Sequence, residues 1–219
     1  QSQASVTGLV NGGFVVTWRS KYSAMTRDYD VFGRVFDDSG NNIGSEFLIN
    51  TNDASAQYQP KVTELSDGGF VVSWTSSVPL FDGSSATEIV GQRFDLYGNK
   101  VGNDFLINSF TEAGQNISNI STLKDGGFIV VWDTYERNWG LVGQRFDSSG
   151  TKVDSEFRVN TNSSRSQTSA NVTSLDNGGF VIVWQGRTYN TGDRSLSGIS
   201  GQRFDRFGNK EGIEFRVNT

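Results

Sequence analysis

The heptapeptide Gly68–Trp74, which reads GGFVVSW, decides the fold because it returns in three other places along the chain. Its relatives are GGFVVTW at Gly12–Trp18, GGFIVVW at Gly126–Trp132 and GGFVIVW at Gly178–Trp184. The copies lie about 55 residues apart, a period typical of repeat architectures. The chain therefore consists of four related units.

A longer block of constant length follows each of these tryptophans. In the second unit it reads GQRFDLYGNKVGNDFLINS from Gly91, and its counterparts begin at Gly33, Gly143 and Gly201. A short first element, such as Val62-Thr63-Glu64-Leu65, precedes each Gly-Gly pair, and eight residues before its leucine stands a glutamine (Gln1, Gln57, Gln115, Gln167). We predict a single repeat domain over residues 1–219, with repeats at 1–51, 52–109, 110–161 and 162–219.

Alternation and turn chemistry predict four strands in each unit. Phe70, Val72 and Trp74 share one face of the second strand, and Ile129 with Val131 makes the opposite face apolar in the third unit. A strand that is apolar on both faces must be covered on both faces. The polar turns that end in Gly-Gly and the Asp-x-x-Gly-Asn turns are hairpin signals, because these residues tolerate positive φ.

These features predict an all-β fold, a β-propeller of four-stranded antiparallel blades with four repeats in this chain. Four blades would form a four-bladed ring, or part of a larger or dimeric propeller. Two other architectures remain open, a tandem series of β-sandwiches and a linear β-solenoid. The sandwich would not need both sides of its central strands covered, and solenoid rungs are usually shorter.

The combination GGFVVxW and GQRFDxxGNxVGxEFxxNT resembles the tandem repeats of about 50 residues in very large secreted bacterial proteins, many of them calcium-binding RTX-type adhesins and surface-layer-associated proteins. All four units carry the resemblance. It implies a cell-surface or extracellular setting. The nonapeptide GGxGxDxUx that binds calcium in RTX rolls does not occur in the sequence, so that mode of calcium binding does not carry over.

Composition excludes several function classes. The chain has no Cys and no His, which removes thiol nucleophiles, Ser-His-Asp triads and the usual zinc sites. A net charge of -5 makes nucleic acid an unlikely partner. No apolar run of membrane-spanning length and no leader peptide is visible, so no membrane insertion is expected. The initial Gln1 suggests a processed chain or a fragment of a longer protein.

Three repeated residue types have structural interpretations. The arginines just before Phe-Asp (Arg34, Arg93, Arg145, Arg203) are expected to pair with the acids across the next turn (Glu46, Asp104, Glu156, Glu214). The Asp-x-x-Gly turns are expected to be held by backbone hydrogen bonds, so that no cofactor is predicted and calcium, although conceivable, has no supporting motif. The repeated tryptophans are expected to pack between blades, with a sugar-stacking platform as the alternative.

The connection between the second and third strands differs in every unit. All four connections should emerge on one face of the ring, and they carry aromatic, carboxylate, amide and guanidinium groups suited to sugars. We predict a ligand site drawn from these connections, consisting of Tyr135, Trp139, Tyr189, Asp193, Asp82 and Tyr22.

The function predicted from these loops is a non-enzymatic binding module of a secreted bacterial surface protein, in adhesion or lectin-like glycan binding. Its expected partners are glycans or cell-surface components, and it would lie outside the cell or on its surface, with a homodimer as one assembly. One alternative is a structural spacer or self-assembly unit without a ligand. Another is a glycosidase that uses two carboxylates among Asp82, Glu88, Asp133 and Glu136.

Overall fold

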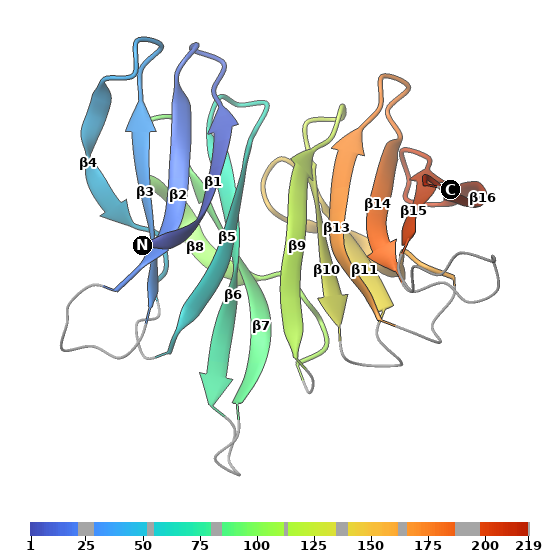
Figure 1. The fold of residues 1–219 in the computed structure, drawn as a ribbon. Helices are drawn as coiled ribbons and strands as arrows, with labels where there is room; N and C mark the ends of the chain where they lie inside the picture. The colour runs from blue at the N-terminus through green and yellow to red at the C-terminus, as the bar shows by residue number, and fades with distance from the viewer. Residues whose placement is uncertain are drawn as a thin grey trace. The chain divides into compact units, whose positions relative to one another are not determined.

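The computed structural model describes residues 1–21, 29–51, 55–79, 85–111, 114–134, 140–161, 166–186 and 198–218, with backbone alone at 117 and 118. Every regular element in these ranges is a β-strand (Figure 1). Among the same residues, no helix is long and apolar enough to cross a membrane. The all-β prediction is confirmed.

The strands form four sheets of four, each an antiparallel meander in chain order. The first blade is β1 (Ser2–Gly8), β2 (Phe14–Ser20), β3 (Asp30–Phe36) and β4 (Asn42–Leu48). The second is β5 (Gln57–Glu64), β6 (Phe70–Pro79), β7 (Ser85–Phe94) and β8 (Lys100–Leu106). The third is β9 (Gln115–Thr122), β10 (Phe128–Thr134), β11 (Gly140–Phe146) and β12 (Lys152–Arg158). The fourth is β13 (Gln167–Ser174), β14 (Phe180–Gly186), β15 (Gly198–Phe204) and β16 (Lys210–Arg216). These are the four-stranded blades of a β-propeller, as predicted.

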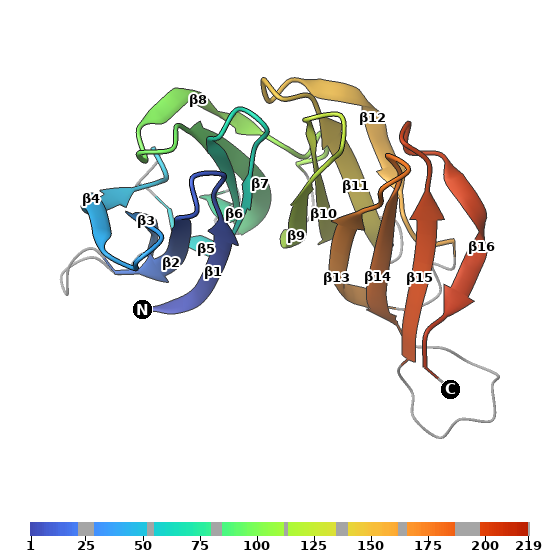
Figure 2. The ribbon, with the colours of Figure 1, turned by 90° about the horizontal axis from the view of Figure 1, so that it is seen from above.

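Contacts divide the chain into two compact units, Gln1–Ile117 and Ser118–Thr219. The first unit contains the first two blades, and β5 packs there against β1, β2 and β3. The second unit contains the other two blades apart from the first residues of β9, and β13 packs there against β10 and β11. Figure 2 shows the same order of four strands in each sheet.

The Gly-Gly pair makes the first hairpin possible in every blade. Gly68 has a φ of 87°, which favours glycine. A Cβ on Gly69 would lie 2.3 Å from the carbonyl oxygen of Phe94 on β7, the strand that pairs with β6. The turn is closed by Asp67, whose carboxylate accepts the Gly69 N–H at 3.0 Å. The two glycines therefore serve different purposes, one conformational and one steric.

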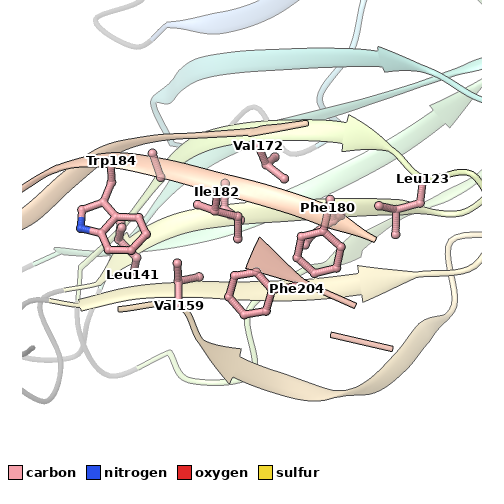
Figure 3. Packing of buried hydrophobic residues seen from close by; sticks show 11 residues of the cluster. Leu123, Leu141, Val159, Val172, Phe180, Ile182, Trp184 and Phe204 are labelled. Carbon is pink, nitrogen blue, oxygen red and sulfur yellow. The ribbon is translucent and has the colours of Figure 1, made fainter. Parts of the chain in front are cut away.

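Both apolar faces of a blade are used where two blades meet within a unit. In the second unit Phe180, Ile182 and Trp184 follow one another along β14 (Figure 3) and pack with Ile129, Val131 and other residues of the third blade. Ile129, Val131, Phe180 and Ile182 are fully buried. The predicted two-sided covering of the strands is thus present at this interface.

The repeated tryptophans are core residues in three blades and differ in the first. Trp74, Trp132 and Trp184 are 1–2% exposed, which supports blade packing over a sugar-stacking platform at these positions. The indole N–H of Trp74 donates to Gln57 Oε1 at 2.8 Å, and that of Trp184 to Gln167 Oε1 at 2.7 Å. The repeated glutamine, whose role the sequence left unassigned, thus anchors the tryptophan. Trp18 is only half-buried, and its Nε1 has no hydrogen-bond partner among the described residues.

The predicted arginine pairs are wrong in their partners. Arg93 pairs with Asp67 at 2.8 Å and Arg145 with Asp125 at 3.0 Å, both acids of the Gly-Gly turn. Arg203 pairs with Glu211 at 3.2 Å. Strand register explains this, because the arginine side chain lies toward the first hairpin turn or the bulge of the last strand.

Arg34 does not belong to the arginine series. It faces Val16 in the register, as Gln92 faces Val72, so the first blade has Arg where the others have Gln and has Val35 where the others have Arg. The acids predicted to pair with these arginines act instead on lysines of their own strands. The charges of Asp104, Glu156 and Glu214 raise the pKa values of Lys100, Lys152 and Lys210, against the larger lowering by burial.

Candidate active site at the loop end of the first two blades

The four variable connections leave the blades at equivalent places. The last pairs of their flanking strands are Ser20 with Asp30, Pro79 with Ser85, Thr134 with Gly140 and Gly186 with Gly198. In each blade this end lies opposite the Gly-Gly and Asp-x-x-Gly turns. The six predicted ligand residues, Tyr22, Asp82, Tyr135, Trp139, Tyr189 and Asp193, all fall in connections outside the described residues.

At this end of the first unit, an arginine lies between two tyrosines. The Arg19 guanidinium carbon is 4.0 Å from the ring centroid of Tyr29 and 5.3 Å from that of Tyr58. Lys21 Nζ lies 5.2 Å from the Tyr29 centroid. A cation over an aromatic face is attracted by the ring quadrupole. We call Arg19, Tyr29 and Tyr58 the Arg-Tyr cluster.

Backbone contacts between the blades hold the cluster in place. Arg19 is the penultimate residue of β2, Tyr29 precedes β3, and Tyr58 lies on β5 of the second blade. The Gln57 N–H donates to the Tyr29 carbonyl at 2.7 Å, joining the two tyrosine-bearing segments. Next to Tyr58, Gln59 has a φ of 52° in a bulge of β5, and its N–H donates to Gln3 Oε1 at 2.9 Å. Two blades therefore share one cluster.

The cluster combines apolar faces with hydrogen-bond donors. Arg19, Tyr29 and Tyr58 are all half-buried, so part of each side chain remains accessible. The Nε of Arg19 is buried and has no hydrogen-bond partner among the described residues. Tyrosine rings suit the C–H faces of a sugar, while guanidinium and phenol groups can hydrogen-bond its hydroxyls.

Two carboxylates lie at the same end of these two blades. Asp30 opens β3, and Glu88 holds the same repeat position on β7, three residues before Gly33 and Gly91 respectively. Asp30 is 9% exposed and accepts a hydrogen bond from Asn50 Nδ2 at 2.9 Å. Asn50 in turn accepts the Val31 N–H at 2.9 Å, so the carboxylate is fixed to the blade.

Glu88 is the less constrained of the two acids. It is half-buried, faces Ser76 on β6, and makes no hydrogen bond or ion pair within the described part of the chain. The corresponding positions of the third and fourth blades are glycines, Gly140 and Gly198. Carboxylates at this position thus occur only in the first unit. Of the other suggested glycosidase acids, Asp133 lies at the end of β10 in the second unit, and Asp82 and Glu136 are outside the described residues.

The sequence missed Arg19 and Tyr58 because both lie on strands rather than in the connections. A signal was available, since each departs from its repeat. At the position of Arg19 the other repeats have Thr75, Asp133 and Gln185. At the position of Tyr58 they have Ser2, Asn116 and Thr168.

The Asp-x-x-Gly turns satisfy their own carboxylates, as predicted. Asp37 accepts the Asn41 side-chain amide at 2.9 Å, the Asn41 backbone N–H at 2.7 Å and the Ser39 N–H at 3.0 Å. The side-chain hydrogen bond from Asn41, followed by the backbone bonds, lowers the pKa of Asp37. Within the ranges that the structure describes, no group of three or more acidic or metal-binding side chains could hold a metal ion.

Comparison with known proteins identifies the fold but no family. No family model matches the chain, and no curated protein matches it. The resemblance to RTX-type repeats therefore remains a prediction.

Solved structures share the blade architecture at low sequence identity. A protein of unknown function from Dyadobacter fermentans has a TM-score of 0.72 and 16% identity, over 98% of this chain and 68% of that chain. An α-L-arabinanase from Penicillium chrysogenum complexed with arabinobiose has a TM-score of 0.69 and 17% identity, over 98% and 65%. A GH43 endo-arabinanase from Bacillus licheniformis has a TM-score of 0.59 and 14% identity, over 99% and 79%. These likenesses establish the propeller fold.

The same comparison contradicts the prediction of a non-enzymatic adhesion or lectin-like module and its spacer alternative. The similar structures of named activity are glycoside hydrolases, together with a PL25 ulvan lyase at a TM-score of 0.64 and 10% identity. The prediction rested on the composition of the connections, which does not distinguish a binding surface from a catalytic one.

Proposed function

We propose that the chain belongs to a carbohydrate-active enzyme that binds a polysaccharide at the loop end of the first unit and cleaves its glycosidic bonds by hydrolysis. One observation carries the proposal. Residues with polar or aromatic side chains that differ from their counterparts in other repeats lie at this end of two adjacent blades. They are Arg19, Tyr29, Asp30, Tyr58 and Glu88.

The chemistry available to the chain is restricted by its composition. With no His and no Cys, proton transfer falls to carboxylates, tyrosines or lysines. Glycoside hydrolysis needs two carboxyl groups, one to protonate the leaving oxygen and one to act as base or nucleophile. Asp30 is held by Asn50, whereas Glu88 makes no hydrogen bond or ion pair with the described residues, and such a difference in environment lets two carboxyls take different roles.

The Arg-Tyr cluster is assigned to substrate binding. Tyr29 and Tyr58 would stack on sugar rings, and the accessible part of the half-buried Arg19 guanidinium would donate to a hydroxyl or ring oxygen. The arabinose-containing ligand of the Penicillium arabinanase makes arabinan the first polysaccharide to test. An extracellular location would give such an enzyme access to polysaccharides outside the cell.

The test is release of reducing ends from arabinan, galactan and ulvan by the purified chain. We expect hydrolysis of at least one polymer, with loss of roughly a hundredfold or more in rate for Glu88→Gln or Asp30→Asn. Asp38→Asn, an exposed acid in the opposite turn, should retain full activity. Products that absorb as unsaturated uronates would indicate a lyase instead. The proposal would be overturned if the purified chain cleaved none of the three polysaccharides while its circular dichroism spectrum showed a folded β protein.

A further inference from the structure

The interface between two blades of one unit has a recurring aromatic element. On the last strand of a blade, Phe47 lies over Gly33 of its own sheet, where a Cβ would be only 2.8 Å from the ring. Its ring reaches the next blade, with its centroid 5.5 Å from that of Phe94 and 6.5 Å from that of Phe70. Phe70 and Phe94 are themselves stacked, with centroids 5.1 Å apart. We call the last-strand ring the knob and the stacked pair the socket.

The second unit repeats this arrangement. Phe157 is the knob, 5.2 Å from Phe204 and 6.1 Å from Phe180, whose rings stack at 5.0 Å. The four socket rings of the two interfaces are 0–2% exposed. The knob also packs against a turn glycine of the next blade, Gly98 for Phe47, where the ring would be 2.6 Å from a Cβ.

The first blade carries a socket without a knob. Phe14 and Phe36 stack at 4.8 Å with an interplanar angle of 8°, the same geometry as the two occupied sockets. Both rings are only half-buried. The turn glycine Gly40, equivalent to Gly98, has nothing within 4 Å of a Cβ position. A groove of about 520 Å³ lies beside them, lined in part by Val16, Trp18 and Phe36.

The fourth blade carries a knob without a socket. Phe215 lies over Gly201 as the other knobs lie over their glycines, with its ring 2.6 Å from a Cβ position, and it is 41% exposed. Val181 and Val183, on the face of β14 opposite Trp184, are half-buried, whereas the equivalent Ile129 and Val131 of the third blade are fully buried. Each unit therefore has one apolar face that its own blades leave uncovered, the socket face of the first blade in the first unit and the knob face of the fourth blade in the second unit.

Polar groups of the interface are also matched. Where the third and fourth blades meet, Glu214 accepts the backbone N–H of Thr161, and Lys210 Nζ donates to Thr161 Oγ1 at 3.0 Å. Glu46 holds the position of Glu214 in the first blade and lines the groove. The first blade thus offers a carboxylate as well as the aromatic socket.

We propose that the first blade of one copy binds the fourth blade of a second copy, with Phe215 inserted between Phe14, Phe36 and Gly40. The knob and its seat on Gly201 reproduce the interface found within each unit, so a second copy of the chain supplies the complementary face. The interface is heterologous, joining chains head to tail, and it closes into a ring or grows into a filament according to the rotation between copies.

Sedimentation equilibrium over two decades of protein concentration tests the association. We expect the wild-type chain to self-associate and Phe215→Ala to weaken association roughly tenfold or more, as for a buried aromatic anchor. Ile213→Ser is the matched control, because Ile213 is 89% exposed and the equivalent residues Ser45 and Ser155 are serines. This variant should associate like the wild type.

A mixing experiment tests the direction of the contact. Val16→Lys places a charge in the socket and keeps the knob, while Phe215→Ala removes the knob and keeps the socket. Each variant alone should associate at least about tenfold more weakly than the wild type, and their mixture should form heterodimers through one restored interface. A wild-type chain that stays monomeric, as it would if its own fourth blade filled the socket, overturns the proposal. So does association that both variants leave unchanged.

Discussion

Replacing Trp74 with phenylalanine tests whether the buried tryptophan-glutamine pair holds the blade. The indole N–H donates to Gln57 Oε1 at 2.8 Å, and both side chains are 0–1% exposed. Losing this donor at a buried acceptor should cost about 1–3 kcal/mol, and the smaller ring should add about 1 kcal/mol through lost packing. We expect a total loss in the free energy of unfolding of about 2–4 kcal/mol.

The first blade supplies a control for this substitution. Trp18 is half-buried and its Nε1 has no hydrogen-bond partner among the described residues, so Trp18→Phe removes no such bond. Its expected cost is below about 1 kcal/mol. Urea unfolding followed by circular dichroism, rather than fluorescence, avoids the change in tryptophan content.

A double-mutant cycle isolates the hydrogen bond itself. Gln57→Met combined with Trp74→Phe should show a coupling energy of about 1 kcal/mol between the two side chains. Equal costs for Trp18→Phe and Trp74→Phe, together with zero coupling, would refute the reasoning. The tryptophan would then contribute through its area alone.

Three further outcomes follow from the same structure. Trp132→Ala should lower the free energy of unfolding by about 3–5 kcal/mol in urea titrations, because the ring is 1% exposed and leaves a cavity. Gly69→Ala should cost more than about 2 kcal/mol, because its Cβ would lie 2.3 Å from a carbonyl oxygen, whereas Gly102→Ala, with a φ of 70° and open space, should cost about 1 kcal/mol. The lowered pKa of Asp37 means that its stabilising effect is present above the unfolded pKa and is lost as pH falls through the folded pKa. Melting temperatures measured across the acidic range should therefore fall less steeply in Asp37→Ala than in the wild type.

Local sequence was sufficient to predict the blades. Each hairpin depends on residues close together in the chain, such as the Gly68-Gly69 turn and the alternation of Phe70, Val72 and Trp74. These signals act over a few residues. Because they recur in four repeats, a strand or turn that is ambiguous in one repeat can be recognised from the other three. For the connections, by contrast, a ligand site was predicted from composition alone. All six of its residues lie outside the described ranges, so it stays a prediction.

Tertiary packing decided which residues meet across the blades. The sequence placed Arg93 opposite Asp104, but strand register brings it to Asp67, and only the fold brings Tyr58 of the second blade to Arg19 of the first. Likewise Phe47 and Phe215 occupy identical repeat positions, yet one lies against a socket and the other is 41% exposed. Periodicity fixes the direction of a side chain relative to its own strand, whereas its partner depends on the neighbouring blade, which no local pattern encodes.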